Sequence, residues 1–456
     1  MDSTIFKAYD IRGIYPDQVN EETAWKIGFA TARFLRSMLS GYARGQANCQ
    51  CICVGHDMRR HSRQLADALI TGINAAAANV IDIGLIDTPQ MYFAINHLNT
   101  CGGVQVTASL NPANYNGFKI AGFQAKPVGA DTGLKDIEHI ATALLHTKGK
   151  IDGSVERYDL TEAYKRHILK FLALGQRSFK IAVDASNGMA GKMVPLIFND
   201  LPIEIIPINF EHTGTFKHDL NPLLEGVLKE LKATVKKYNC DFGICFDGDA
   251  DRIVFVDENT EKIESDLLTV LLASYFLKTF PKSVIVYDLR SSLVVPEEII
   301  ANGGIPRRER VGHAFIKKAM RDSHAVFAGE LSGHFYYRDN YYTDSAFITL
   351  VHVLNILSAK GLPLSKLIAP LKRYASSGEL NFKVEDKMQK ITELEKKFPG
   401  GETDHLDGVT VRFKDWWFNC RPSNIEPLLR LKAEAKNQEM LQDKLAEITE
   451  ILGQPV

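Results

Sequence analysis

The sequence predicts an α/β fold divided among several domains. Strand-like runs of alternating apolar residues and helix-like apolar stripes follow one another through the first third of the chain, a pattern that favours a mostly parallel sheet covered by helices. The length of 456 residues suggests three or four domains of roughly 100–150 residues each. An apolar strand, an aspartate and a polar turn occur together three times, at Asp57, Asp184 and Asp288. This weak internal repeat leads us to expect three related domains.

The first domain is expected at residues 1–150, because the polar, glycine-containing stretch 148–154 indicates a boundary. Within it, Ser62 is predicted to cap one helix, and Thr88-Pro89 to form the cap and first turn of the next. The other expected elements are, in chain order, a helix with Ile27, Ala30 and Phe34 on one face, a strand at 51–54, a strand at 80–86 and a strand containing Val104 and Val106.

Three further domains are expected, two of them α/β and the last α+β. Each α/β domain should contain one of the remaining repeated strands, at 179–184 and 284–288, and a helix at 163–174 should open the second domain. The last domain should contain a strand ending near Phe418 and a helix at 437–452 that packs on its own domain. The expected bounds of these domains are 151–256, 257–371 and 372–456.

The composition is that of an ordinary soluble globular protein, with 45% hydrophobic and 24% charged residues. A net charge of -1 gives no support for a nucleic-acid partner, which requires a basic surface. The most apolar run, Leu267–Leu277, is too short to span a bilayer and fits a buried helix. Because the N-terminus also lacks a signal pattern, we expect a cytoplasmic protein without a membrane partner, as a monomer or weak dimer.

The seven cysteines are expected to be reduced thiols, since an odd number does not form a complete disulfide set. Cys49, Cys51 and Cys53 alternate along a predicted strand and so project to one face of it. Metal binding at these three residues is the alternative. However, no second Cys/His cluster of zinc spacing accompanies them in the sequence.

Ser109 is the first candidate for chemistry. The strand containing Val104 and Val106 precedes it, and Asn111-Pro112 imposes a turn because a residue before proline is excluded from the helical region. Ser109 is therefore expected on a loop past the carboxyl end of a strand, where open α/β sheets bind ligands. Such a serine can be a nucleophile or a phosphoryl carrier. The alternative is a turn serine that hydrogen-bonds its own backbone.

Asp247, Asp249 and Asp251 are the second candidate, because they place three carboxylates at alternate positions. Bunched carboxylates repel one another, so they predict a bound cation, and oxygen ligands suit a hard ion such as Mg²⁺. A solvated acidic turn is one alternative. A calcium loop is another, because Glu258 falls at the twelfth position from Asp247. Arg252 argues against it by occupying the sixth position, where the tight turn requires glycine.

Two loops contain groups that suit a sugar or a phosphate. Glu330 and Ser332 are two residues apart, so an extended loop would direct both side chains the same way. A carboxylate beside a hydroxyl can bind vicinal sugar hydroxyls, which both donate and accept. The alternative is a turn with a solvated glutamate. Near the N-terminus, Tyr9 and Arg12 are close enough to share a loop that faces a phosphate, or one that is simply on the surface.

A third loop contains Arg421, Ser423 and Asn424. The guanidinium offers a fixed fork of donors, and the two neutral side chains add further donors. This set suits a phosphate dianion. The alternative is a loop arginine paired with Glu426.

From Tyr9 to Arg430, and in the same order, the chain resembles the α-D-phosphohexomutase family, most closely its bacterial phosphomannomutase/phosphoglucomutase members. The motifs that carry this resemblance are Thr107-Ala108-Ser109-Leu110-Asn111-Pro112, Asp247-Gly248-Asp249-Ala250-Asp251-Arg252 and Gly329-Glu330-Leu331-Ser332-Gly333-His334. The resemblance implies three related α/β domains with mixed, mostly parallel sheets and a C-terminal α+β domain, arranged around a central cleft.

The resemblance also implies an activity. Ser109 would be a phosphoserine, and Mg²⁺ would be held by Ser109 and the three aspartates. The enzyme would interconvert mannose 6-phosphate and mannose 1-phosphate through a hexose 1,6-bisphosphate, with the glucose phosphates as a second candidate pair of substrates. By resemblance, Lys119, Arg252 and His313 join Ser109 as catalytic residues. The residues expected to bind the hexose monophosphate are Tyr9, Arg12, Arg290, Gly312, Glu330, Ser332, His334, Arg421, Ser423, Asn424 and Arg430.

Two positions depart from the family pattern. Leu110 replaces the usual histidine after the carrier serine and cannot move a proton. Ile425 replaces a threonine, which removes roughly 1 kcal/mol of phosphate binding. A phosphosugar-binding paralogue with impaired turnover is therefore one alternative function, and a phosphoglucosamine mutase is another. The preferred hexose is left open.

Overall fold

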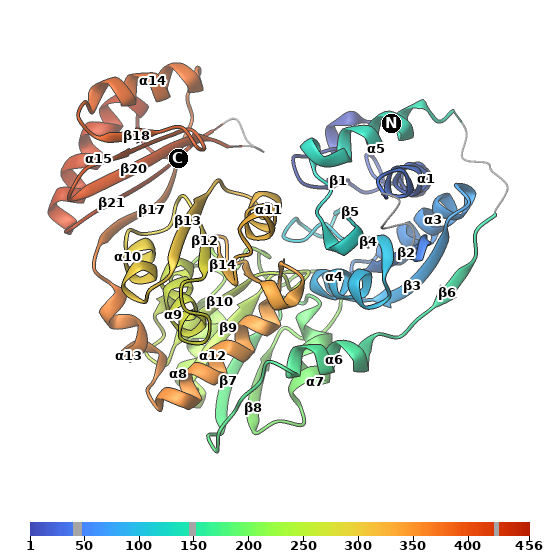
Figure 1. Ribbon diagram of the computed structural model, residues 1–456, viewed down its shortest axis with the longest axis horizontal. Coiled ribbons are helices and arrows are strands. Elements are labelled where there is room, and N and C mark those ends of the chain that lie inside the picture. The colour runs from blue at the N-terminus through green and yellow to red at the C-terminus, as the bar shows by residue number, and fades with distance from the viewer. Residues whose placement is uncertain (40–47, 146–151, 424–427) are drawn as a thin grey trace. The chain divides into compact units, whose positions relative to one another are not determined.

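The computed structural model describes residues 1–39, 48–145, 152–423 and 428–456 (Figure 1). These residues form two compact units, which are described separately. Unit 1 comprises Met1–Ile263 and Ser332–Ser365, and unit 2 comprises Glu264–Leu331 and Lys366–Val456. Four sheets occur in the described residues.

The first sheet of unit 1 is mixed, as the sequence predicted. Its strand order is β1-β5-β4-β2-β3-β6, with parallel pairing from β4 to β6 and antiparallel pairing from β1 to β4. The strands are β1 (Ile11–Ile14), β2 (Asn48–His56), β3 (Asn79–Leu85), β4 (Thr100–Val106), β5 (Tyr115–Gly122) and β6 (Val155–Arg157). The helices are α1 (Glu21–Ser37), α3 (Ser62–Ala75), α4 (Thr88–His97) and α5 (Lys135–Ala143).

The second sheet of unit 1 has the order β11-β10-β9-β7-β8. Strand β7 is parallel to both of its neighbours, whereas β9, β10 and β11 form an antiparallel meander. The strands are β7 (Phe179–Asp184), β8 (Ile203–Ile208), β9 (Phe242–Phe246), β10 (Ile253–Asp257) and β11 (Lys262–Ile263). The other elements of unit 1 are α6 (Thr161–Leu169), α7 (Ala190–Phe198), α8 (Lys229–Tyr238), the hairpin β15 (Phe335–Tyr337) and β16 (Thr343–Asp344), and α12 (Ala346–Lys360).

Unit 2 begins with parallel strands and ends with an antiparallel sheet. β12 (Val284–Asp288) pairs in parallel with β13 (Ile305–Glu309) and β14 (Phe327–Gly329). The accompanying helices are α9 (Ser265–Thr279), α10 (Val294–Ala301) and α11 (His313–Ser323). Helix α9 contains the predicted apolar run, and eight of the eleven residues of that run are buried.

The C-terminal sheet in unit 2 is wholly antiparallel, with the order β17-β21-β20-β19-β18. This arrangement confirms the predicted α+β character of the last domain. Its elements are β17 (Ala375–Phe382), α14 (Lys387–Lys397), β18 (Glu402–Asp404), β19 (Val409–Arg412), β20 (Trp416–Pro422), β21 (Leu429–Ala435) and α15 (Gln438–Leu452). Leu441 and Ile448 of α15 lie in the same apolar core as Phe418 of β20. The predicted packing of this helix on its own domain is therefore correct.

The repeated strand-and-aspartate pattern corresponds to one turn that occurs three times. β2, β7 and β12 are each hydrogen-bonded in parallel on both sides. At the carboxyl end of each strand, an aspartate Oδ1 accepts from the backbone N–H two residues further on, which is the Asx-turn geometry. The three donors belong to Arg59, Ser186 and Arg290, at 3.0, 2.9 and 2.8 Å.

Two predicted helix starts are wrong. The cap of α3 is His61, and the Ser62 hydroxyl donates to Oδ1 of Asp57. The cap of α4 is Asp87, whose carboxylate accepts from the Gln90 N–H at 2.7 Å. In both cases the predicted capping hydroxyl has a tertiary partner.

Two predicted boundaries also differ. Helix α6 ends at Leu169 instead of 174. Asn355 of α12 accounts for this end, because its side chain bonds the Phe171 carbonyl and the Ala173 N–H, each at 2.7 Å. Strand β20 continues past Phe418 to Pro422, so Arg421 belongs to the strand.

The described residues contain no single helix long and apolar enough to cross a membrane. Helix α12 and the segment Leu364–Leu371 pass the length and composition test only as a pair bent by 91°. Twelve residues of α12 are buried inside the protein.

Candidate active site

Ser109 lies on the turn after β4, as the sequence predicted, and it is buried. Its φ of +48° is in the left-handed region, which a non-glycine residue adopts only when its surroundings impose it. The Thr107 hydroxyl accepts from the Ser109 N–H at 2.9 Å. This turn is therefore fixed by contacts and presents the hydroxyl in one orientation.

Arg59 provides most of those contacts. Its guanidinium donates to the carbonyls of Ser109 at 2.8 Å, Asn111 at 2.7 Å, Pro112 at 2.6 Å and Tyr115 at 3.2 Å. Asp57 accepts from its Nε at 3.2 Å, and both side chains are 1% exposed. A buried charge-assisted network of this kind holds its partners strongly.

The acidic loop connects β9 to β10, and its three aspartates are buried. Oδ1 of Asp247 accepts from the N–H groups of Asp251 and Arg252, both at 3.2 Å, so the loop curls around this carboxylate. Ligand oxygens of the three aspartates lie within 4.8 Å of one another. This spacing allows one cation to contact all three.

The acidic loop and the Ser109 turn meet within unit 1. Oγ of Ser109 donates to Oδ2 of Asp247 at 3.3 Å. A Cβ on Gly248 would lie 2.8 Å from the Ser109 carbonyl, closer than real Cβ atoms approach. The glycine therefore permits this contact between the two loops.

Lys119 on β5 bridges two of the aspartates. Its ammonium is 2.6 Å from Oδ2 of both Asp249 and Asp251. The Thr88 hydroxyl also donates to Oδ2 of Asp249, at 2.6 Å. The other oxygen of Asp249, Oδ1, is buried without a hydrogen-bond partner in the described structure.

Two further cationic or titratable groups border the aspartates. Nε of Arg252 is 3.6 Å from Oδ2 of Asp247. Nε2 of His334 is 3.2 Å from Oδ1 of Asp251, and Nδ1 of the same ring is 2.9 Å from the Ser332 hydroxyl. Four of the predicted site residues, Ser109, Lys119, Arg252 and His334, are thus brought together around the three aspartates.

The three carboxyl groups differ in proton affinity. Burial, together with the charges of Asp251 and Asp249, raises the pKa of Asp247 well above its usual value. Burial alone would raise the pKa of Asp251, yet Lys119 and His334 lower the pKa of that carboxyl well below the usual range. Burial also opposes the shift at Lys119, but Asp249 and Asp251 raise the pKa of its ammonium. Lys119 therefore stays charged.

Arg12 is close to the Ser109 turn. It donates to Asn111 Oδ1 at 2.8 Å and to the Ala108 carbonyl at 3.3 Å, and Asp10 holds its guanidinium at 2.6 Å. Tyr9 is partly buried just before β1. The phosphate-facing roles of Tyr9 and Arg12 stay predictions.

In unit 2, the predicted sugar residues lie near the carboxyl ends of parallel strands. Glu330 follows β14, and its Oε1 accepts from the Gly312 N–H at 3.1 Å. Oε1 of Glu330 is also 3.9 Å from Arg290. His313 is the first residue of α11. The structure thus groups Arg290, Gly312, His313 and Glu330 in unit 2, whereas Ser332 and His334 belong to unit 1.

The predicted phosphate residues of the last domain form an arginine cluster with Glu379 of β17. Oε2 of Glu379 accepts from Arg421 at 2.8 Å and from Arg290 at 3.3 Å, and Oε1 accepts from Arg430 at 3.2 Å. Ser423 is buried, and its N–H donates to the Leu428 carbonyl. Asn424, Ile425 and Glu426 lie outside the described residues.

The two alternative metal sites are not supported. Glu258, the twelfth residue of the supposed calcium loop, accepts from the hydroxyl and N–H of Ser365. The flanks of that loop are the strands β9 and β10, whereas a calcium loop of this kind lies between two helices. Cys51 and Cys53 are buried thiols outside any disulfide, and burial raises the pKa of Cys53 to about 12.

Sequence reasoning missed Arg59, Thr88 and Glu379. A signal for Arg59 was present, because Asp57-Met58-Arg59 and Asp288-Leu289-Arg290 occupy equivalent turns and only Arg290 was selected. Thr88 was missed because it was interpreted as a helix cap. Glu379 follows Gly378 in a strand with few buried residues, so its sequence gives no sign of a functional role. Neither has a local pattern that points to its partners.

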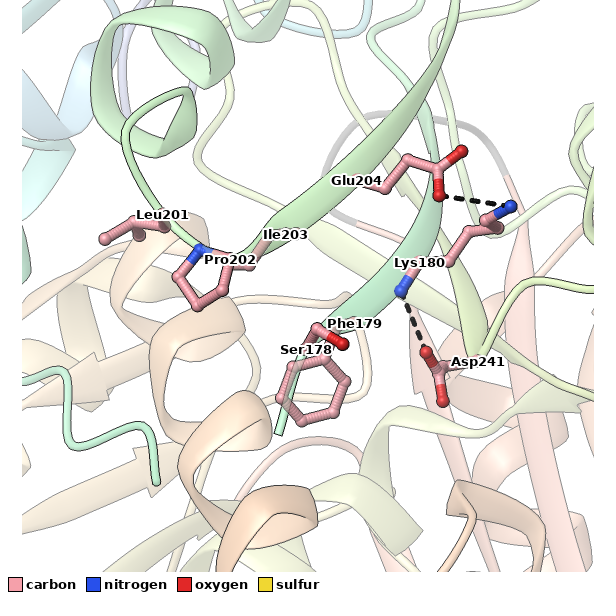
Figure 2. Close-up of a pocket in the computed structure, with 8 residues that line it drawn as sticks. All are labelled: Ser178, Phe179, Lys180, Leu201, Pro202, Ile203, Glu204 and Asp241. Atoms are coloured by element: carbon pink, nitrogen blue, oxygen red, sulfur yellow. Dashed lines mark hydrogen bonds and ion pairs between the residues drawn. The ribbon is translucent and has the colours of Figure 1, made fainter. Parts of the chain in front are cut away.

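A separate hollow of about 500 Å³ lies at the amino ends of β7 and β8 (Figure 2). Asp184, at the carboxyl end of β7, belongs to the opposite end of the same strand. Lys180 in the hollow is already paired, with Glu204 at 3.1 Å through its ammonium and with Asp241 at 2.8 Å through its N–H (Figure 2). The hollow therefore does not resemble the Ser109 site, because its lysine is already paired and it lies at the other end of β7.

Comparison with known families matches all four parts of the chain. The matching models are described as phosphoglucomutase/phosphomannomutase α/β/α domain I at residues 3–147, domain II at 162–261, domain III at 264–374 and the C-terminal domain at 379–451. The four-domain α/β fold predicted from the sequence is thereby confirmed.

Similar proteins agree with these matches over their full length. A protein of Xanthomonas campestris named phosphohexose mutases is 37% identical over 453 residues, covering 98% of both chains. A phosphomannomutase of Vibrio cholerae is 36% identical over 461 residues, with the same coverage. The crystal structure of a phosphoglucomutase/phosphomannomutase family protein from Burkholderia thailandensis superimposes with a TM-score of 0.88 at 30% identity, covering 99% of this chain and 98% of that one.

Proposed function

Since the chain belongs to the phosphoglucomutase/phosphomannomutase family, and is therefore a phosphohexomutase of the isomerase class, we propose that it interconverts mannose 6-phosphate and mannose 1-phosphate. Ser109 would carry the phosphoryl group, and a hexose 1,6-bisphosphate would be the intermediate. The observation that carries this proposal is the 3.3 Å contact between the Ser109 hydroxyl and Asp247 of a buried carboxylate group. The proposed phosphoryl carrier and the proposed cation ligands are thus adjacent.

The residues present fit a divalent cation. Three buried carboxylates within 4.8 Å repel one another unless they are neutralised, and Oδ1 of Asp249 is a buried acceptor without a hydrogen-bond partner in the described chain. An all-oxygen donor set favours Mg²⁺ over zinc or copper. Asp247, Asp249, Asp251 and Ser109 would hold the ion, which would withdraw charge from the phosphoryl group during transfer.

Lys119 and Arg252 would supply fixed positive charge at the same centre. Phosphoryl transfer spreads negative charge over the equatorial oxygens, so positioned cations stabilise it. Lys119 stays protonated between two carboxylates and is thus a source of charge rather than a base. His313 is therefore the residue we assign to proton transfer, because Leu110 occupies the position where the family usually has histidine.

In the first half-reaction the bond between Ser109 Oγ and phosphorus would break, a bond would form between phosphorus and the free sugar hydroxyl, and His313 would take the hydroxyl proton, which gives the bisphosphate. The reverse transfer from the other end of the sugar restores the phosphoserine. The sugar must therefore bind in two orientations. We assign sugar binding to Glu330 and Ser332 and binding of the non-reacting phosphate to Arg421 and Ser423.

The direct test is incubation with mannose 1-phosphate and a trace of mannose 1,6-bisphosphate, followed by phosphorus NMR. We expect mannose 6-phosphate to form and Ser109→Ala to abolish its formation. Ser178→Ala is the matched control, because Ser178 is an exposed residue at the separate hollow. A Ser109→Ala protein as active as the control would refute the assignment.

Two other functions remain distinguishable by experiment. Phosphoglucosamine mutase activity would appear as a faster rate on glucosamine phosphate than on mannose or glucose phosphate. One observation favours a phosphosugar-binding protein with impaired turnover: Leu110 stands where the family usually has histidine. Intact-mass spectrometry separates that case, because a working mutase carries a phosphoryl group on part of its Ser109.

A further inference from the structure

Glu379 lies at the meeting point of three arginines in unit 2. Arg421 on β20 and Arg430 on β21 are directly opposite one another in the antiparallel pairing. Like charges in that arrangement repel. Both guanidiniums, and that of Arg290 from the turn after β12, donate to the single carboxylate of Glu379. The cluster is therefore held together by one anion that belongs to the protein.

The backbone of β17 is shaped to deliver this carboxylate. The pairing between β17 and β21 shifts register between Ser376 and Glu379, and Gly378 has a φ of +68°. A bulge of this kind redirects the side chains that follow it. Beyond it, Asn381 pairs with Arg430. Because residues two apart share a strand face, Glu379 lies on the face of β17 that also presents Asn381.

The arginines are firmly charged and the glutamate is firmly ionised. Burial opposes the shift, but Arg290, Arg421 and Arg430 lower the pKa of Glu379 to about 2. Asp288 holds Arg290 separately, through bonds of 2.8 and 3.2 Å. The Arg421 guanidinium has five donors, so donors beyond the one bonded to Glu379 can serve a phosphate.

We propose that Glu379 is a positioning residue that sets the strength of the phosphate subsite formed by Arg421 and its neighbours. It gathers the three arginines and at the same time subtracts one unit of positive charge from the subsite. This inference rests on the proposed function, in which that subsite holds the non-reacting phosphate. A hexose 1,6-bisphosphate must leave the subsite before its other phosphate can occupy it, so a subsite that bound a dianion too tightly would slow turnover.

The test is to titrate inorganic phosphate into wild-type protein and Glu379→Gln by calorimetry. Glutamine keeps the shape and removes the charge. We expect phosphate to bind about tenfold more tightly, because a unit charge beside a dianion changes the binding energy by that order even in a solvated site. In steady-state kinetics, KM for the hexose phosphate and kcat should both fall. Glu379→Ala removes both the charge and the acceptors that gather the arginines, so it should bind phosphate less tightly than Glu379→Gln.

Two controls isolate the charge. Glu379→Asp keeps the charge and should bind phosphate within about twofold of wild type. Glu385→Gln makes the same change in net charge at an exposed position of the same domain and should have no effect. In Arg421→Ala/Glu379→Gln the gain should disappear, which ties it to this subsite.

Phosphate binding that is unchanged or weaker in Glu379→Gln would overturn the proposal. Binding is measured without turnover, so it also separates the two levels of inference. If wild-type protein lacked mutase activity but Glu379→Gln still bound phosphate more tightly than wild type, the proposed function would be wrong and the proposed role of Glu379 would stand.

Discussion

Arg59 offers the sharpest test of how the Ser109 turn is maintained. It is 3% exposed and donates to four backbone carbonyls between residues 109 and 115. In Arg59→Lys the charge beside Asp57 remains, but a single ammonium cannot reach all four carbonyls. If three of these bonds are lost at about 1 kcal/mol each, the turn is destabilised by about 3 kcal/mol.

Hydrogen exchange measures this change locally, which matters because a protein of several domains has no single unfolding free energy. A loss of about 3 kcal/mol corresponds to roughly 150-fold faster exchange of the amides in residues 107–115. Once these contacts are lost, Ser109 should also leave the left-handed region. The phosphoserine content and kcat should therefore fall, whereas KM should change less.

The matched control is Arg60→Lys, because Arg60 is the adjacent residue and is exposed. We expect the control to exchange and turn over like wild type. If Arg59→Lys exchanged its 107–115 amides at the wild-type rate and accepted phosphate normally on Ser109, the assignment of Arg59 as the support of this turn would be wrong.

Two other changes test the buried charges. Lys119→Met removes the ammonium between Asp249 and Asp251. When a chelator has removed Mg²⁺, we expect the variant to be less stable than wild type by about 3–5 kcal/mol, because two buried carboxylates lose their partner. Calorimetry should show that Mg²⁺ raises the melting temperature of the variant more than that of wild type, and equal responses would contradict the account. Glu434, 1% exposed, has its pKa raised by burial to about 7, so the folded protein binds its proton more tightly than the unfolded chain. The associated stability is present below pH 4.5, the unfolded value, and is lost as the pH rises to about 7, up to about 3 kcal/mol. Glu434→Gln should lack this pH dependence in calorimetric scans between pH 5 and 7.5, and an unchanged slope would assign the effect to another group.

The sequence predicted the parts of the fold and site that rest on local patterns. Alternating valines before Ser109, the spacing of the three aspartates and the repeated strand-and-aspartate pattern each specify a short segment, and the structure has each of them. The meeting of Ser109 with Asp247, 138 residues apart, followed from family resemblance and not from either segment alone.

Two of the errors arose where a distant residue overrides a local preference. Thr88 has a capping side chain, but Asp249 takes its hydroxyl and Asp87 caps the helix instead. Helix α6 has helical residues beyond Leu169, but Asn355 binds the backbone groups that another turn would need. Such partners lie more than 150 residues away, so no window of sequence contains both.

In the turn shared by β2, β7 and β12, the residue that forms the turn is different from the residue that makes contacts elsewhere. The aspartate does the structural task in every copy, which leaves the residue two places later free to diverge. Arg59 braces a neighbouring loop, Ser186 bonds the Phe246 carbonyl at 2.6 Å just before the acidic loop, and Arg290 reaches Glu379. A repeated turn of this kind can take on a different task in each domain by the change of one side chain, while the strand end that supports it stays the same.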